Sequence, residues 1–100
     1  MDVIAELEST LRNRKLNPPT GSYTAQLLAA GEDEIVKKIG EEAVEIILAA
    51  KGQGNSRVIE ESADLVYHLL VLLVSRDLSW TDVERELKRR SPAQGVNERA

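Results

Sequence analysis

Apolar residues recur at the three- and four-residue spacing of α-helices along most of the chain, and no segment alternates as a half-buried strand would. The pattern predicts a helix over about residues 2–14, a Pro-rich loop and then further helices. We expect these over about residues 22–30, 32–51 and 56–76, and from about residue 79 or 81 to residue 90. The sequence therefore predicts an all-α bundle of four to five helices.

Capping residues mark several of the expected helix ends. Ser22 or Thr24 can cap the short helix, and Gly31 ends it in the manner usual for glycine. Thr81 and Glu84 fit a capping box at the start of the last helix. These signals predict separate helices where hydrophobicity alone would leave the boundaries open.

The turn "GQGN", residues 52–55, separates the two long helices and predicts that they lie side by side and antiparallel. We expect one domain over residues 1–90, in which residues 1–21 contribute the first helix and the Pro-rich loop. Residues 91–100 have little to bury, and we expect a disordered tail there.

The two long helices differ in their apolar patterns. The segment from Leu65 to Val74 is apolar nearly all round, which predicts burial on every side. A chain of 100 residues covers one side of such a helix more readily than all of them, so we expect a subunit interface there. The alternative is a central helix buried within one subunit. The helix before it has a predicted core stripe of Ile35, Ile39, Ala43, Ile46, Ile47 and Ala50.

Composition narrows the possible chemistry. There is no cysteine, so disulfides and thiolate metal sites are excluded, and any metal ion would be held by oxygen ligands. The net charge is −4 without a basic stripe, which argues against a nucleic-acid partner. The acidic start does not resemble a signal peptide, and the longest nearly apolar run is too short to span a bilayer. We expect a cytoplasmic protein with no membrane partner.

Carboxylates are concentrated at corresponding places on the two long helices. Glu42 and Glu45 are three residues apart in "GEEAVE", and Glu61 and Asp64 repeat that spacing in "ESAD". Glu42 lies about ten residues before the turn and Asp64 about ten after it, so antiparallel packing places the two pairs level with each other. Divalent cations would relieve the resulting repulsion. The alternative is that each pair is simply a solvated helix face.

These two motifs resemble the EExxE…ExxD signature of the MazG-like, all-α nucleotide pyrophosphohydrolases, with 15 residues between "GEEAVE" and "ESAD". Longer stretches, "GSYTAQLLAAGEDEIVKKIGEEAVEIILAAK" and "ESADLVYHLLVLL", resemble the phosphoribosyl-ATP pyrophosphatases of histidine biosynthesis. The resemblance implies Mg²⁺-dependent hydrolysis of phosphoribosyl-ATP to phosphoribosyl-AMP and pyrophosphate, with Mn²⁺ as a possible substitute. It also implies four metal ligands: Glu42, Glu45, Glu61 and Asp64.

Other residues near the motifs are candidates for supporting roles. Glu41 is a candidate to accept a proton from the attacking water, and Lys38 to contact a phosphate, unless it only pairs with the glutamate four residues later. Tyr23 and Ser22 are candidates to line the substrate pocket, unless they only begin a helix. His68 is a candidate to hydrogen-bond beside a metal ligand, although a satisfied core position is the alternative for a histidine in an apolar run.

The sequence leaves two other functions open. One is a MazG-type pyrophosphatase for canonical or modified nucleoside triphosphates, with the same site and a different substrate. The other is a non-catalytic helical oligomerisation module whose acidic faces only confer solubility. We expect a homodimer or higher homo-oligomer.

Overall fold

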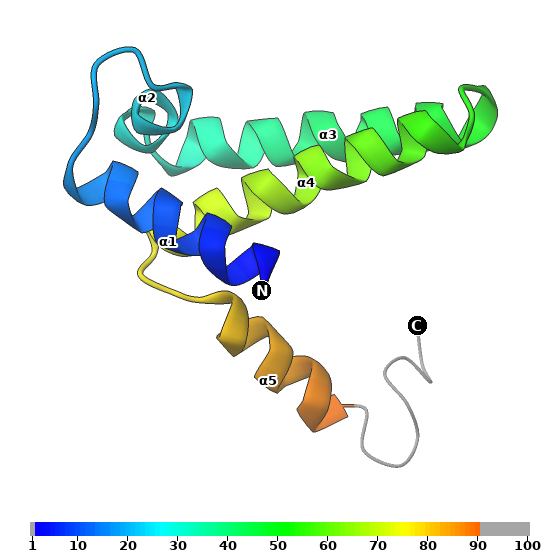
Figure 1. Ribbon diagram of the computed structural model, residues 1–100. Helices are drawn as coiled ribbons and strands as arrows, with labels where there is room; N and C mark the ends of the chain where they lie inside the picture. Colours follow the sequence, from blue (N-terminus) through cyan, green and yellow to red (C-terminus); the bar gives the residue numbers. More distant parts are fainter. Residues whose placement is uncertain (1, 91–100) are drawn as a thin grey trace.

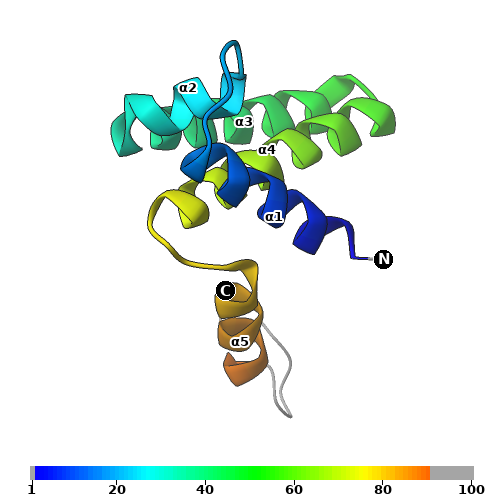
Figure 2. The same ribbon diagram turned by 60° about the vertical axis from the view of Figure 1, so that its left-hand side comes forward.

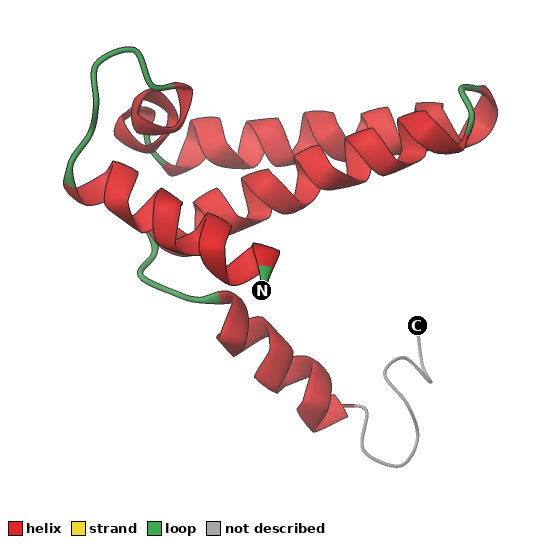
Figure 3. Cartoon of the chain, viewed as in Figure 1, coloured by secondary structure: helices red, strands yellow, loops and turns green. Residues whose placement is uncertain are grey.

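The structure is a computed structural model that describes residues 2–90. Over these residues the chain forms five helices and no strand, which confirms the all-α prediction (Figures 1 and 3). The predicted tail, residues 91–100, lies outside the described part of the chain. The helices are α1 (Val3–Leu16), α2 (Tyr23–Ala30), α3 (Glu32–Gly52), α4 (Asn55–Ser75) and α5 (Trp80–Arg90).

The two long helices, α3 and α4, form an antiparallel hairpin and run side by side along their lengths (Figure 1). The chain reverses through Gln53 and Gly54. Gly54 has φ of 89°, a backbone conformation that residues with a side chain rarely adopt, so glycine suits this turn. The predicted turn and the antiparallel arrangement are both confirmed.

The hydrophobic core lies at the end of the hairpin away from this turn, where α1 and α2 pack against it (Figures 1 and 2). Each buried aliphatic side chain there contributes about 1.5–3 kcal/mol of transfer free energy. Within residues 2–90, the part of the hairpin toward the turn is covered chiefly by the contact between α3 and α4 (Figure 1). The core residues are Leu11, Leu27, Ile35, Leu70, Val71 and Val74.

Two of the predicted helix ends are confirmed and one is wrong. The Ser22 hydroxyl accepts a hydrogen bond from the Ala25 N–H at 3.1 Å and caps α2, which ends at Gly31. The cap of α5 is Ser79 with Asp82, not Thr81 with Glu84: the Ser79 N–H donates to the Asp82 carboxylate at 2.9 Å, and the Asp82 N–H donates to the Ser79 hydroxyl at 3.3 Å. Thr81 is already inside the helix.

The predicted core stripe of α3 is correct at its start and wrong near its end. Ile35 is buried and Ile39 packs against the core, but Ile47 is 58 % exposed and Ala50 is exposed too. Ala49 is buried instead, at 1 %. The line that faces α4 continues from Ile39 through Glu42 and Ile46 to Ala49, at spacings of three and four. The predicted stripe follows apolar residues alone and therefore departs from this line at Glu42, where the position facing α4 is a carboxylate.

The apolar segment of α4 is covered to a greater degree than its sequence suggests. None of the ten residues from Leu65 to Val74 is fully exposed. The exposed large apolar residues of the hairpin lie chiefly on α3, with Ile59 near the start of α4. On α3 they are Val36, Val44, Ile47 and Leu48, with exposed fractions between 44 % and 58 %. The reason for expecting a subunit interface therefore moves from α4 to α3.

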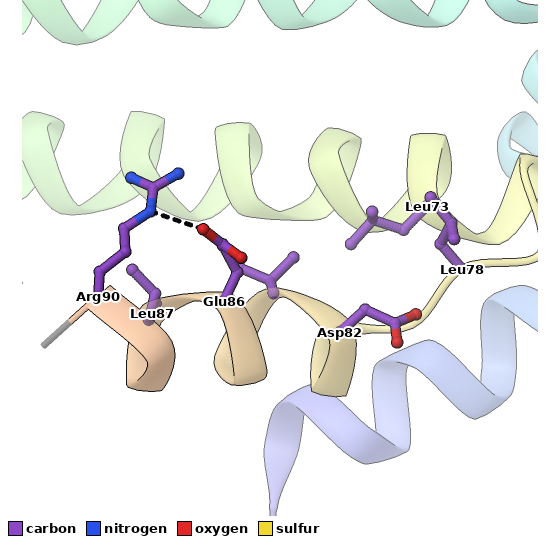
Figure 4. Close-up of a pocket in the computed structure, with 7 residues that line it drawn as sticks. Leu73, Leu78, Asp82, Glu86, Leu87 and Arg90 are labelled. Atoms are coloured by element: carbon purple, nitrogen blue, oxygen red, sulfur yellow. Dashed lines mark hydrogen bonds and ion pairs between the residues drawn. The ribbon is translucent and has the colours of Figure 1, made fainter. Parts of the chain in front are cut away.

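The last helix, α5, extends away from the hairpin, and none of its residues is buried (Figures 1 and 2). A groove with a volume of about 300 Å³ separates its apolar side from the end of α4 (Figure 4). An ion pair between Arg90 and Glu86, 2.9 Å long, lies along it. The residues lining the groove are Leu73, Leu78, Asp82, Val83, Glu86, Leu87 and Arg90.

Among residues 2–90, no helix has both the length and the hydrophobicity needed to cross a bilayer.

Candidate metal centre and active site

Three carboxylates from the two long helices converge on one point of the hairpin. Glu42 of α3 and Glu61 and Asp64 of α4 each place a carboxylate oxygen within 4.8 Å of the others. Glu61 is buried, Glu42 is half-buried and Asp64 is exposed, so the group reaches from the helix interface to the surface. We refer to these three residues as the carboxylate group.

The antiparallel hairpin produces this convergence. Glu42 lies ten residues before Gly52 at the end of α3, and Asp64 lies ten residues after Gly54 at the start of α4. With a rise of about 1.5 Å per residue in both helices, the two positions are level. The expectation that Glu42, Glu61 and Asp64 meet across the helix pair is therefore confirmed as geometry.

The crowding of the carboxylates is reflected in the pKa of Glu42. Burial raises the pKa of Glu42 above its ordinary value of 4.5, and a hydrogen bond to Glu61 and the charges of Asp64 and Glu61 raise it further. A proton on Glu42 is one way to relieve the crowding, and a bound cation is another. The group thus favours the entry of positive charge.

Arg57 is a member of this site that the sequence interpretation missed. Its guanidinium contacts the carboxylates of Glu61 and Glu60, each at 2.6 Å. The first contact is an ordinary i,i+4 pair on α4, so the spacing of Arg57 and Glu61 in the sequence was a signal that could have revealed it. The negative charge at the start of α4 is therefore better balanced by positive charge than its run of acidic residues suggested.

Glu45, the fourth predicted ligand, is half-buried on α3 but does not belong to the group of converging oxygens. It is three residues, almost one turn, beyond Glu42. Its role as a ligand stays a prediction. The structure brings together three of the four predicted carboxylates.

Lys38 and Glu41 lie next to each other on α3. The Lys38 ammonium is 3.7 Å from the Glu41 carboxylate, an exposed i,i+3 contact, so the alternative pairing of Lys38 with Glu42 is not the one formed. Surface pairs of this kind contribute about 0–1 kcal/mol. Both side chains are therefore held only weakly and can turn toward a phosphate or a water molecule.

His68 lies one turn beyond Asp64 on α4 and is 6 % exposed. Its Nδ1 is 2.8 Å from the backbone carbonyl oxygen of Asp64, and its Nε2 is 3.0 Å from the Tyr23 hydroxyl. Tyr23 begins α2, directly after the capping residue Ser22. The histidine is thus both a satisfied buried residue and a neighbour of the carboxylate group, and it links that group to α2.

The chemistry of the carboxylate group fits a divalent metal ion. Its donors are all carboxylate oxygens, which hard cations such as Mg²⁺ and Mn²⁺ prefer. The three carboxylate oxygens lie within 4.8 Å of one another, so their negative charges repel, and a cation would offset that repulsion. Glu42, Glu61 and Asp64 can hold such an ion.

Comparison with known proteins gives a consistent result over nearly the whole chain. The profile of the family described as phosphoribosyl-ATP pyrophosphohydrolase matches residues 4–91. A phosphoribosyl-ATP pyrophosphatase of Dechloromonas aromatica is 44 % identical over 99 residues, which cover 99 % of this chain and 92 % of that protein.

Two further relatives show the same similarity. A phosphoribosyl-ATP pyrophosphatase of Pelotomaculum thermopropionicum is 51 % identical over 89 residues, 89 % of this chain and 91 % of that protein. A histidine biosynthesis bifunctional protein of Caldanaerobacter subterraneus is 41 % identical over 90 residues, which cover 90 % of this chain and 44 % of that longer protein.

Proposed function

The chain belongs to the phosphoribosyl-ATP pyrophosphohydrolase family, and on that basis we propose that it hydrolyses the α–β phosphoanhydride of phosphoribosyl-ATP. The products are phosphoribosyl-AMP and pyrophosphate, as in the second step of L-histidine biosynthesis, and a cytoplasmic location is part of the proposal. The observation that supports this chemistry most directly is the convergence of Glu42, Glu61 and Asp64 within 4.8 Å.

The proposed cofactor is Mg²⁺, with Mn²⁺ as a substitute, held by the carboxylate group and by Glu45 as a fourth ligand. When bound, the ion neutralises the polyphosphate and stabilises the departing pyrophosphate. The exposed position of Asp64 and the buried position of Glu61 suit this function, because substrate approaches from the surface while the inner ligand stays fixed by Arg57.

The neighbouring side chains of α3 have complementary roles in the proposal. Glu41 accepts the proton of the attacking water as the oxygen of that water bonds to phosphorus and the bond between that phosphorus and the bridging anhydride oxygen breaks. Attack at either phosphorus gives the same products. Lys38, one turn before Glu42, contacts a phosphate and leaves its weak pairing with Glu41 to do so.

The start of α2 forms the other side of the proposed substrate pocket. Tyr23 and Ser22 line it, although the Ser22 hydroxyl is also engaged as the cap of α2. His68 does not contact substrate in this proposal. It hydrogen-bonds to the backbone of Asp64 and to Tyr23, and so joins the metal ligand to the pocket wall.

The proposed assembly is a homodimer formed through the apolar face of α3, which we define as Val36, Gly40, Ala43, Val44, Ile47 and Leu48. Four of these residues are large apolar side chains with exposed fractions of 44 % or more. The face runs from Val36 to Leu48, about 20 Å along the helix, and at roughly 10 Å wide it presents about 200 Å². The support for a dimer is the concentration of these apolar residues on one helix face.

Gly40 supports a second copy of this chain as the partner. A Cβ at this position would meet no atom within 4 Å, so packing within the chain does not require glycine there. Glycine in a helix interior costs about 1 kcal/mol relative to alanine. Glycine at position 40 would allow another helix to approach closely, which explains why the cost is tolerated. In a two-fold dimer, that helix is the same face of a second α3.

The test of the catalytic proposal is product analysis after incubation with phosphoribosyl-ATP and Mg²⁺. Release of pyrophosphate with phosphoribosyl-AMP is the expected result, and release of orthophosphate would identify a different bond. The same assay with dNTPs separates the related function, because equal or faster turnover of dNTPs would replace the proposed substrate. A protein that hydrolyses neither and ignores Mg²⁺ would be a helical oligomerisation module.

A further inference from the structure

A hydrogen-bonded chain leads from a residue of the carboxylate group to the ring of Tyr23. The Asp64 carbonyl oxygen can only accept, so His68 Nδ1 carries the proton and donates to it at 2.8 Å. In the neutral imidazole Nε2 is then an acceptor, and the Tyr23 hydroxyl donates to it at 3.0 Å. The buried histidine therefore fixes the position of the Tyr23 hydroxyl.

Tyr23 is oriented in an unusual way. A tyrosine at a surface normally buries its ring and leaves the hydroxyl in water. Here the hydroxyl is bound to the buried His68, and burial raises its pKa, yet the residue as a whole is 49 % exposed. The ring is supported by Tyr67, with centroids 6.4 Å apart and planes 26° from parallel. A firmly held tyrosine is thus about half exposed to solvent.

This tyrosine lies close to the site of phosphate chemistry. One imidazole ring separates the Tyr23 hydroxyl from Asp64: His68 contacts the hydroxyl at 3.0 Å and the Asp64 backbone oxygen at 2.8 Å, which places Tyr23 near the carboxylate group. His68 is four residues, or about 6 Å along α4, beyond Asp64. In a nucleotide one ribose separates the α-phosphate from the base. A substrate whose phosphates lie at the carboxylate group therefore brings its base toward Tyr23.

We propose that Tyr23 is the specificity-determining residue of this site, that its ring stacks on the base of phosphoribosyl-ATP, and that His68 is a positioning residue that holds the ring by its hydroxyl. This inference rests on the proposed function and adds the means of substrate selection. Where the added phosphoribosyl group makes the base cationic, the electron-rich face of tyrosine attracts it, whereas the adenine of ATP is neutral.

The test compares variants of Tyr23 in binding and in catalysis. The probes are phosphoribosyl-AMP and AMP, titrated by calorimetry, together with KM and kcat for phosphoribosyl-ATP and ATP. For Tyr23→Leu we expect about a tenfold rise in Kd for phosphoribosyl-AMP and in KM for phosphoribosyl-ATP. The kcat for phosphoribosyl-ATP changes less than twofold, and the preference over ATP falls by about the same tenfold factor.

Variants of His68 test the positioning role. For His68→Leu, which frees the Tyr23 hydroxyl, we expect a rise of about threefold to fivefold in KM with less change in kcat. For His68→Gln, whose amide oxygen can accept from Tyr23, we expect KM to return toward the wild-type value. A His68→Gln variant as impaired as His68→Leu would overturn the positioning role.

Tyr67→Phe is the matched control. It removes the hydroxyl that pairs with Thr24, the neighbouring hydrogen bond between α2 and α4, and keeps the supporting ring. We expect its KM and its preference for phosphoribosyl-ATP to equal those of the wild type, whereas Tyr23→Phe raises KM. Equal effects of the two Tyr→Phe changes would overturn the proposal in favour of a structural role in docking α2.

The outcomes separate this inference from the proposed function. If the wild-type protein releases no pyrophosphate from phosphoribosyl-ATP, the proposed function fails and this inference fails with it. If the wild-type protein is active and Tyr23→Leu binds phosphoribosyl-AMP and AMP with the wild-type ratio of affinities, only this inference fails.

Discussion

The acidic and the apolar sides of α3 differ in chemistry, but each is unfavourable for an isolated chain. On one side Glu42 lies close to Glu61 and Asp64, and burial together with these two carboxylates raises its pKa. On the other side Ile47 and its apolar neighbours face water across a helix surface that contains a glycine. A sequence that only had to fold would have little reason to keep either feature.

The difference between the two sides indicates different partners. Crowded oxygen donors call for a small, hard cation, because a divalent ion can approach all three at once. An extended apolar strip favours a large complementary surface, because the free energy gained by removing apolar surface from water is proportional to the area buried. One helix can serve both purposes since positions three and four residues apart define one face and leave the opposite face free.

The largest effect is expected from the acidic side. For Glu61→Gln or Asp64→Asn we expect kcat to fall by about 1,000-fold, because a ligand that supplies several kcal/mol of charge stabilisation is lost. The thermal midpoint without metal should stay equal or rise, since carboxylate repulsion is relieved. Asp33→Asn, in the exposed first turn of α3, is the control and should retain activity. Full activity in either site variant would refute the ligand assignment.

The apolar side is tested by placing a charge on it. For Ile47→Glu we expect the dimer dissociation constant to rise about 100-fold, because a buried contact is replaced by an unpaired carboxylate. Analytical ultracentrifugation should show a shift toward the 11.1 kDa mass of one chain. Gln26→Glu introduces the same charge on the exposed surface of α2 and should leave the mass unchanged. A wild-type protein that is already monomeric would rule out the α3 interface.

Gly40 allows a finer test of the same face. In the monomeric Ile47→Glu background, Gly40→Ala should raise the free energy of unfolding by about 1 kcal/mol, because the added methyl group meets no neighbour and helix propensity improves. In the wild-type background the gain should vanish, because the methyl group separates the two helices. Chemical denaturation of the four proteins measures this difference. An equal gain in both backgrounds would mean that no helix approaches Gly40 closely.

The smallest expected effect is a pH dependence on the acidic side. Burial first, and then Glu61 and Asp64, raise the pKa of Glu42 in the folded protein above 4.5, so the folded state keeps a proton that the unfolded chain has released. Without metal, the free energy of unfolding should therefore fall as pH rises from 4.5 through the raised value. Glu42→Gln should lack this decline in thermal midpoint. A parallel decline in both proteins would assign the effect to other groups.

The sequence was sufficient to predict the helices, the hairpin and the meeting of Glu42 with Glu61 and Asp64, because these follow from spacing alone. It was not sufficient for the core stripe of α3. The line facing α4 passes through Glu42, and an interpretation that follows apolar residues moves instead to Ile47 and Ala50. A carboxylate occupies this packing position on α3 in place of an apolar side chain.

Interactions between distant segments were also beyond the sequence. The pairing of Tyr23 with His68 joins α2 to α4, and only the packing of those helices brings the two residues together. Ser79 with Asp82 and Thr81 with Glu84 both have the three-residue spacing of a helix cap, and the sequence alone did not show that the first pair forms it. The place of Glu45 at the site stays a prediction.

The most direct test of the metal centre is a titration of Mn²⁺ followed by electron paramagnetic resonance of the free ion, with the wild-type protein and Asp64→Asn. The carboxylate group predicts saturable binding by the wild-type protein and at least a tenfold weaker affinity for Asp64→Asn. Absence of binding to the wild-type protein, or equal affinity of the two proteins, would contradict a cation site formed by Glu42, Glu61 and Asp64.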